Sequence, residues 1–291
     1  MDRLGRVFPF LLAGLVGAAC AGPLNYTHGD GPRFTGCGDD ASVGWNPRTG
    51  LPAPGRTAPV PASGELRVVS FNIQFAVRID EAIAVLTGDP NLRTADVILL
   101  QEMDEPGVRR IAAAFGYCWV YYPATLHPRS RRHFGNAILS RYPFRGDGKV
   151  LLPHLGRFGK TLRIAVTATL DVHGVPVRVY SVHLATTVEL GPRAREDQAR
   201  AIIADAAAAA GPVLIGGDFN ARALGELFAE AGYDWITRDL GKTTPLASLD
   251  HFFVRGLETK PGTAVGRSPD DAGASDHLPI WARLALPPPG E

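Results

Sequence analysis

The sequence has few cysteines and almost equal numbers of basic and acidic residues. Each of these features argues against a class of protein. Three cysteines in 291 residues are too few for a disulfide-rich scaffold. Lys and Arg total 30 against 29 Asp and Glu, so the formal net charge is only +1. Such a balance argues against bulk electrostatic capture of nucleic acid, although it allows a local basic patch. With 45% hydrophobic residues the chain is not a disordered tail, and it is long enough for one large globular domain or two modest ones.

The N-terminal apolar run is too short to cross a membrane as a helix. It extends from Val7 to Ala19, about 13 residues against the ~20 that a spanning helix needs. Arg3 and Arg6 precede this run and small residues follow it, an order typical of a secretory signal. We therefore expect a signal peptide over residues 1–20 and export of the protein.

Two routes of processing stay open. Ala18-Ala19-Cys20 resembles the end of a bacterial lipobox, in which the cysteine is lipidated, but Gly17 replaces the usual large aliphatic residue. Ala19-Cys20-Ala21 also reads as an ordinary Ala-x-Ala cleavage site. The expected location is therefore the periplasm, the outer membrane or cell surface as a lipoprotein attached through Cys20, or the medium.

Export would place the two remaining cysteines in an oxidising environment. In an oxidising compartment Cys37 and Cys118 can pair and so join the N-terminal stretch to the body of the protein. The alternative is two unpaired thiols, because sequence spacing does not test the geometry of a bridge.

Residues 21–64 are dense in Gly and Pro and lack a periodic apolar pattern, which predicts a linker. Residues 65–291 form one expected domain, in which strands joined by helices and a hairpin at residues 162–183 indicate an α/β layered sandwich. Strands are expected at residues 66–71, 97–100, 137–140, 213–215, 249–254 and 278–284, and helices at 80–86, 107–115, 193–210 and 224–231.

Polar side chains stand at the ends of these strands. Each of them alone is most often a helix cap or a turn residue. Six sites with the same bias toward metal-ligand and acid–base chemistry point instead to one functional site. They comprise Asn72, Glu102, His183, Asp218 with Asn220, Asp250, and Asp276 with His277.

These residue types suit the hydrolysis of phosphate esters. A hard cation such as Mg²⁺ prefers carboxylate and amide oxygens, which Glu102 and Asn72 supply. A phosphodiester also requires a positioned water molecule and donors around its oxygens, functions that the remaining residues and Arg163 can provide. The sequence has no His-x-Glu, Cys-x-x-Cys or Gly-x-Ser-x-Gly pattern, so a zinc site and a serine hydrolase have little support.

The motifs, taken in order, resemble the endonuclease/exonuclease/phosphatase superfamily of DNase I-like phosphoesterases, as a bacterial exported member. They are Ser70-Phe71-Asn72-Ile73, Leu100-Gln101-Glu102, Ser181-Val182-His183-Leu184, Gly217-Asp218-Phe219-Asn220, Leu249-Asp250-His251 and Ser275-Asp276-His277. The resemblance covers residues 66–285. It implies a four-layered α/β sandwich in which two packed, mixed central sheets are flanked by helices.

The resemblance also implies roles for individual residues. Glu102 would bind Mg²⁺, with Mn²⁺ and Ca²⁺ as alternatives, and Asn72 and Asp276 would help to hold the metal. Asp218 would orient or deprotonate the attacking water, and His277, held by Asp250, would contact the scissile phosphate. Further catalytic and phosphate contacts would come from His183, Asn220 and Arg163. Apart from the resemblance, Asn136 before the expected strand at 137–140 is a candidate phosphate contact. The alternatives are a solvated sheet-face residue for Arg163 and a turn residue for Asn136.

The substrate is left open between nucleic acid and a phospholipid headgroup, as for a nuclease or a sphingomyelinase-like phosphodiesterase, with a phosphomonoester third. The loop of residues 127–133 is basic and could contact either polymer or lipid phosphates. Phe158, Trp119 and Tyr121 are candidates for exposed apolar contacts of a lipid enzyme. A non-catalytic binding protein and a surface tether are the alternatives outside enzymology, and no protein partner is predicted.

Overall fold

The computed structural model describes residues 24–37, 45–46, 51–52, 64–127, 130–259 and 265–287. Residues 1–20 lie outside these ranges, so the signal peptide, the lipobox and export stay predictions. Within the described part of the chain, no helix has the length and apolar character to cross a membrane.

The first sheet contains the two strands that lead to Asn72 and Glu102. These are β5 (Glu65–Asn72) and β6 (Val97–Met103), which run parallel to each other. The sheet order is β1 (Leu24–Asn25), β7 (Cys118–Leu126), β8 (His133–Ser140), β6, β5, β16 (Ile280–Ala285) and β15 (Val265–Arg267), and β2 (Phe34–Cys37) also pairs with β7.

The second sheet has the predicted hairpin at its centre. Its order is β13 (Asp234–Trp235), β14 (Asp250–Arg255), β12 (Val213–Asp218), β11 (Val175–His183), β10 (Ile164–Val172) and β9 (Phe144–Leu151). Strands β11 and β12 are parallel, and the other neighbours are antiparallel, so this sheet is mixed as well. A separate short pair consists of β3 (Trp45–Asn46) and β4 (Leu51–Pro52).

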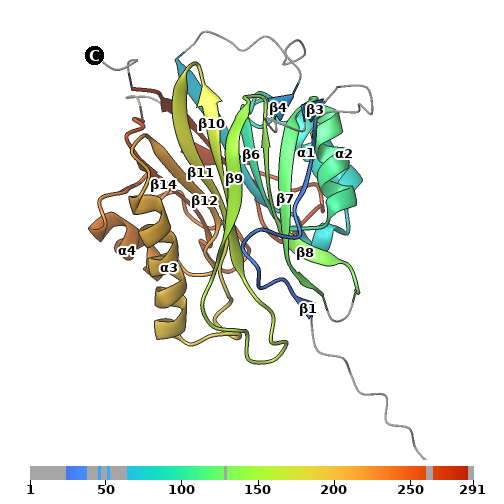
Figure 1. The fold of residues 1–291 in the computed structure, drawn as a ribbon, viewed down its shortest axis with the longest axis vertical. Coiled ribbons are helices and arrows are strands. Elements are labelled where there is room, and N and C mark those ends of the chain that lie inside the picture. The colour runs from blue at the N-terminus through green and yellow to red at the C-terminus, as the bar shows by residue number, and fades with distance from the viewer. Residues whose placement is uncertain are drawn as a thin grey trace, which may run out of the picture.

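Helices cover the outer faces of both sheets, which gives the predicted four layers (Figure 1). The first sheet packs on α1 (Ile79–Gly88) and α2 (Glu105–Phe115), and the second packs on α3 (Pro192–Ala207) and α4 (Gly225–Glu230). Two short 3-10 helices, η1 (Gln74–Ala76) and η2 (Arg222–Leu224), follow β5 and β12. The four-layered sandwich with two mixed sheets is therefore confirmed.

Strands β5 and β6 are buried on both faces, which explains why their sequences are nearly continuous apolar runs. In β5 and β6, Val68 and Leu99 face the core between the two sheets, whereas Val69 and Leu100 face the core under α1 and α2. Successive side chains of a strand point to opposite faces, so both faces require apolar residues.

The helix after β6 shows how short sequence signals fix the ends of an element. Asp104 caps α2 by accepting a hydrogen bond from the backbone N–H of Gly107 at 2.9 Å. Gly116 ends the helix with a left-handed φ of 66°. Glu102 therefore lies near the end of β6, two residues before this cap.

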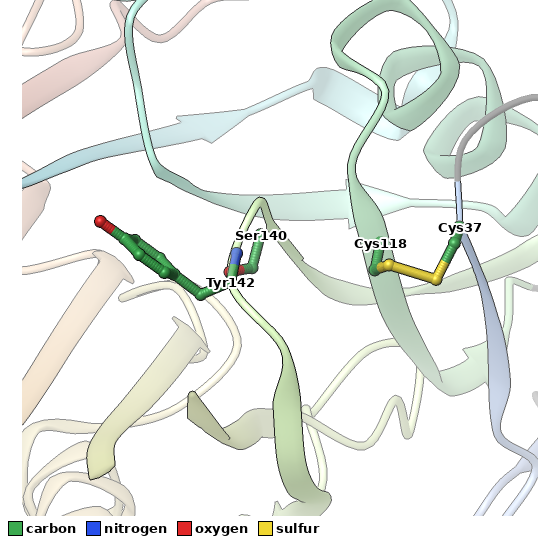
Figure 2. Close-up of a disulfide and its surroundings, with 4 residues drawn as sticks. All are labelled: Cys37, Cys118, Ser140 and Tyr142. Atoms are coloured by element: carbon green, nitrogen blue, oxygen red, sulfur yellow. A yellow bond between two sulfur atoms is a disulfide. The ribbon is translucent and has the colours of Figure 1, made fainter. Parts of the chain in front are cut away.

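The N-terminal strap, which we define as residues 24–37, is part of the first sheet and not a linker. Strands β1 and β2 both pair with β7, and Cys37 lies opposite Cys118 in the register. The two cysteines form a disulfide across a sequence separation of 81, on the side of β7 away from Ser140 and Tyr142 (Figure 2). The prediction of a linker over residues 21–64 is wrong for this stretch, because the edge of β7 offers unpaired backbone groups that a Gly- and Pro-rich segment can still bond.

The strap also contacts the second sheet. Lys149 of β9 donates hydrogen bonds to the carbonyl oxygens of Tyr26 and Gly31, at 3.0 and 2.8 Å. Arg33 donates two hydrogen bonds to Asp147, each of 2.6 Å. The strap therefore joins both halves of the sandwich at one side.

Candidate active site

All six predicted polar sites lie at one end of the sandwich. The carboxyl ends of β5, β6, β11 and β12 meet the amino ends of β14 and β16 there, because the latter two strands run antiparallel to their neighbours. A hydrogen bond of 3.0 Å from Nδ2 of Asn72 to Oδ2 of Asp218 crosses between the two sheets. The side chains therefore converge although they come from separate parts of the chain.

Glycine at two positions allows Asp218 to lie so deep between the sheets. A Cβ atom on Gly216 would lie 2.6 Å from the ring of Phe252, and one on Gly217 would lie 2.0 Å from the carbonyl oxygen of Val182. Gly217 also has a φ of 145°, a backbone conformation that residues with a side chain rarely adopt. The Gly-Gly-Asp sequence is therefore a packing requirement of this strand end.

Two site residues have left-handed backbone conformations. The φ angle is 59° at Glu102 and 53° at Asn220, and neither residue is glycine. Such conformations cost about 1–3 kcal/mol and persist where the surrounding structure fixes them. At Glu102 this conformation coincides with a break in the register between β6 and β8, and at Asn220 it accompanies the hydrogen bond to Asp218.

Asp218 is the centre of the site. It is 1% exposed and accepts hydrogen bonds from Nδ2 of Asn72 and Nδ2 of Asn220, the latter at 3.1 Å. The backbone N–H of Asn220 donates to its other oxygen at 2.8 Å. Burial raises the pKa of Asp218 to about 7, although the nearby positive charge of His277 opposes the rise. The carboxylate can therefore take up a proton near neutral pH.

His277 lies between two carboxylates. Its Nδ1 is 2.8 Å from Oδ2 of Asp250, and its Nε2 is 3.8 Å from Oδ2 of Asp218. Burial alone would lower the pKa of His277, but Asp250 first and then Asp218 raise it to about 10. The imidazole is therefore protonated at neutral pH and can donate a proton.

The loops around His277 fix its position. Ser275 donates to the carbonyl oxygen of Asn72 at 2.7 Å and accepts from the backbone N–H of His277 at 3.1 Å. Thr243 accepts from the backbone N–H of Asp250 at 3.2 Å, and its carbonyl oxygen accepts from Leu278 at 2.7 Å. Sequence reasoning missed Thr243, because nothing in its neighbourhood distinguishes it from an ordinary loop threonine.

His183 faces the same carboxylate from the opposite side. Its Nε2 lies 3.5 Å from Oδ2 of Asp218 and 3.8 Å from Oε1 of Glu102. Burial, together with the positive charges of Arg163 and His277, lowers the pKa of His183 well below its usual value. The site thus combines one neutral and one protonated histidine around Asp218.

Arg163 lies in this site and not on a solvated sheet face. The residue is 7% exposed, and Nη1 is 2.9 Å from Nε2 of His183. Nη2 forms an ion pair of 2.7 Å with Glu189, which also accepts hydrogen bonds from Thr161 and the backbone of Thr186. Glu189 was missed from the sequence, although it is the only carboxylate in the loop directly after His183.

Two aromatic residues also escaped sequence reasoning. The ring of Phe134 lies 5.8 Å from that of His183 and 5.5 Å from the guanidinium carbon of Arg163. The ring of Phe75 lies 5.6 Å from that of Phe134 and is 46% exposed. They form an apolar wall that extends from His183 to the surface.

Asn136 has a structural role. Its Nδ2 donates to the carbonyl oxygens of Ile164 and Ser181, both at 3.0 Å, and the residue is 2% exposed. The amide therefore joins β8 to the second sheet, and its hydrogens are not available to a phosphate, contrary to the predicted contact.

The oxygen-rich part of the site fits a hard divalent cation. Oε1 of Glu102 lies 3.4 Å from Nδ2 of Asn72, its Oε2 accepts from the backbone N–H of Phe75 at 2.9 Å, and burial raises its pKa. Ligand atoms of Asp218, Asp250 and His277 also lie within 4.8 Å of one another. A hard cation such as Mg²⁺ prefers carboxylate and amide oxygens to an imidazole nitrogen, so Glu102 is the better candidate ligand for it. Asp276, the third predicted metal residue, is exposed beside His277.

Comparison with known proteins is consistent with this geometry. The model of the Endonuclease/Exonuclease/phosphatase family matches residues 69–277. No curated protein sequence matches the chain. Among solved structures, an endonuclease/exonuclease/phosphatase from Beutenbergia cavernae is 25% identical, with 76% of this chain and 72% of that chain covered and a TM-score of 0.60.

Two further structures share the fold at lower identity. The human Nocturnin catalytic domain with bound sulfate is 18% identical, with 77% and 95% of the two chains covered and a TM-score of 0.60. D. rerio TDP2 complexed with a single-strand DNA product is 18% identical, with 76% and 98% covered and a TM-score of 0.54.

Proposed function

The chain belongs to the endonuclease/exonuclease/phosphatase family, whose members are generally hydrolytic phosphoesterases, and from this premise we propose that it is a Mg²⁺-dependent phosphodiesterase. The observation that carries the proposal is the position of Asp218. Its carboxylate lies between a neutral His183 and a protonated His277, with two amides bonded to it. This arrangement provides both a proton acceptor and a proton donor at one point.

Asp218 acts on the attacking water. With a pKa of about 7, its carboxylate accepts a proton from water more readily than an ordinary aspartate would. Asn72 and Asn220 hold this carboxylate in one orientation by their hydrogen bonds, so that the water is positioned as well as deprotonated.

His277 acts on the phosphate and the leaving group. As the water oxygen bonds to phosphorus and the opposite phosphorus–oxygen bond breaks, the departing alcohol oxygen takes up a proton, which protonated His277 can donate. Asp250 keeps the imidazole protonated and oriented. Arg163 adds a positive charge close to His183, where negative charge would develop on the phosphate oxygens in the transition state.

Glu102 with Asn72 would hold the metal ion, and Mn²⁺ or Ca²⁺ are alternatives to Mg²⁺. When bound, a divalent cation there would supply positive charge that polarises the phosphate and stabilises the transition state. Export through a signal over residues 1–20, with or without lipid attachment at Cys20, is part of the same proposal and is supported by the sequence pattern. The DNA product bound to D. rerio TDP2 supports a phosphodiester as the substrate.

Hydrolysis of a soluble chromogenic phosphodiester by the purified protein, with Mg²⁺ and with EDTA, tests the proposal. Asp218→Asn should lower kcat by about a thousandfold or more, because the proton acceptor is lost while the hydrogen bonds from the amides can rearrange. Asp171→Asn in the hairpin at the opposite end of β10 is the matched control and should leave kcat unchanged. Absence of any metal-dependent hydrolysis in the folded wild-type protein would overturn the proposal.

A further inference from the structure

The large apolar side chains that remain exposed lie at the active-site end of the molecule. Among the described residues this group has seven members, and each lies in a loop, in η1 or at a strand end, at the end of the sheets where Asp218 lies. They are Leu24, Phe75, Val77, Leu155, Phe158, Val188 and Leu246. Single exposed apolar residues are ordinary, but their concentration at one end marks an interaction surface.

The most exposed of them lie on two loops that bond to each other. Phe158 is 83% exposed and Leu155 is 44% exposed, both in the loop between β9 and β10, and Val188 is 69% exposed in the loop after β11. The backbone N–H of Arg157 donates to the carbonyl oxygen of Glu189 at 3.1 Å and joins the two loops. In Figure 1 the connection from β9 to β10 projects beyond the ends of the strands.

The same two loops carry exposed positive charges. Arg157 and Lys160 flank Phe158, and both are exposed. The one carboxylate in these loops, Glu189, is bonded to Arg163, and no described carboxylate forms an ion pair with Arg157 or Lys160. We call the set Leu155, Arg157, Phe158, Lys160 and Val188 the docking patch. Apolar side chains interspersed with cations match the surface of an anionic lipid bilayer.

The loops of the docking patch are linked to the catalytic residues through Glu189, whose carbonyl oxygen accepts the hydrogen bond from Arg157. Glu189 is bonded at 2.7 Å to Arg163, which in turn lies 2.9 Å from His183. Nε2 of His183 in turn lies 3.5 Å from Oδ2 of Asp218, so contacts run from these loops to the centre of the site. Aliphatic side chains such as Leu155 and Val188 cannot stack on nucleic-acid bases, so the patch suits lipid better than a single strand.

The N-terminal chain leads to the same surface. Asn25 donates a hydrogen bond to the carbonyl oxygen of Lys160 at 2.7 Å and accepts one from the backbone N–H of Leu162 at 2.9 Å. Cys20 precedes Leu24 by four residues, a length that spans at most about 14 Å. A lipid carried by Cys20 would therefore hold the docking patch toward the membrane.

We propose that the docking patch seats the protein on an anionic phospholipid surface and that the substrate is the phosphodiester of a phospholipid headgroup in that surface. The inference rests on the proposed phosphodiesterase function. In the reaction, the water oxygen bonds to the headgroup phosphorus and one phosphorus–oxygen ester bond breaks. Asp218 takes a proton from the water, and the released alcohol takes a proton from His277.

Sedimentation with vesicles tests the docking step. Vesicles of phosphatidylcholine alone and of phosphatidylcholine mixed equally with phosphatidylglycerol are compared. We expect the wild-type protein to bind the anionic vesicles, and the triple variant Leu155→Ser, Phe158→Ser, Val188→Ser to bind about a hundredfold more weakly. Arg157→Glu should weaken binding to the anionic vesicles by about tenfold, whereas Arg145→Glu at the opposite end of β9 should not.

Activity assays separate this inference from the proposed function. Phospholipid hydrolysis in vesicles should fall in parallel with binding in the triple variant, while hydrolysis of a soluble chromogenic phosphodiester stays at the wild-type rate. If the wild-type protein cleaves the soluble ester but neither binds nor cleaves vesicles, the docking inference is overturned and the proposed function stands. Cleavage of plasmid DNA in preference to vesicles, unchanged in the triple variant, overturns it too. Vesicle binding without any phosphodiester cleavage contradicts the proposed function instead.

Discussion

Nδ1 of His277 lies 2.8 Å from Oδ2 of Asp250, and this contact sets the protonation of the imidazole. Asp250 is 1% exposed, so its charge acts through a poorly screened environment. The second oxygen of Asp250 has no hydrogen-bond partner among the described residues. The buried carboxylate therefore serves mainly to stabilise the charged form of His277.

Asp250→Asn should therefore lower the pKa of His277 from about 10 toward its ordinary range. A smaller fraction of the imidazole is then protonated at neutral pH, and we expect kcat to fall by about a hundredfold or more. NMR titration of the imidazole, with kcat measured on the same samples, checks both effects. An unchanged titration in a variant with reduced kcat would show that Asp250 acts in another way.

Glu189→Gln tests whether the ion pair positions Arg163. The amide keeps the size of the side chain but loses the charge, so the guanidinium is held less firmly near His183. We expect KM for a soluble phosphodiester to rise about tenfold with a smaller change in kcat. Glu230→Gln, exposed at the end of α4, is the control. Equal kinetics for both variants would remove the positioning role.

Cys37→Ser should destabilise the protein without changing the chemistry of the site. Loss of the disulfide frees the N-terminal strap in the unfolded state, and we expect the free energy of unfolding to fall by about 2–4 kcal/mol. Urea unfolding measures the free energy of unfolding, and an activity assay on the folded protein measures kcat. Cys118→Ser should have a similar effect, and the double variant should add little to it. A full additive loss would indicate that each cysteine acts by packing alone.

Buried His251 predicts a loss of stability in acid. Burial lowers its pKa to about 4, whereas the unfolded value is about 6.5, so between these values the unfolded chain binds more protons. The contribution of His251 is fully present above about pH 6.5 and is lost as the pH falls toward 4, by up to about 3 kcal/mol. Unfolding in urea at neutral pH and near pH 4 should show a smaller loss for His251→Gln. The same loss in the variant and in the wild-type protein would assign the acid sensitivity to other groups.

Much of the site could be predicted from sequence because its residues follow recognisable strands. Asn72 ends an apolar run, and Asp218 follows a Gly-Gly pair that only a closely packed strand requires. The order of the motifs then indicated the fold as well. Glu189 and Phe134 could not be found in this way, because their role depends on loops and on packing across the sandwich.

Three of the strands that were not predicted, β9, β1 and β2, have a similar explanation. β9 has the sequence Phe-Arg-Gly-Asp-Gly-Lys-Val-Leu, in which glycine and charge hide the alternation of a half-buried strand. β1 and β2 of the strap are strands only because β7 offers them an edge. Local propensity does not contain that information.

Covering this edge has a consequence for solubility. A protein that began at residue 65 would present β7 as a free edge, with Tyr121 and Tyr122 among its side chains, and Lys149 and Asp147 would lose partners in the strap. Free edges of this kind pair readily with other chains. The N-terminal strap, which the sequence alone predicts to be a linker, therefore protects the molecule from aggregation through its first sheet.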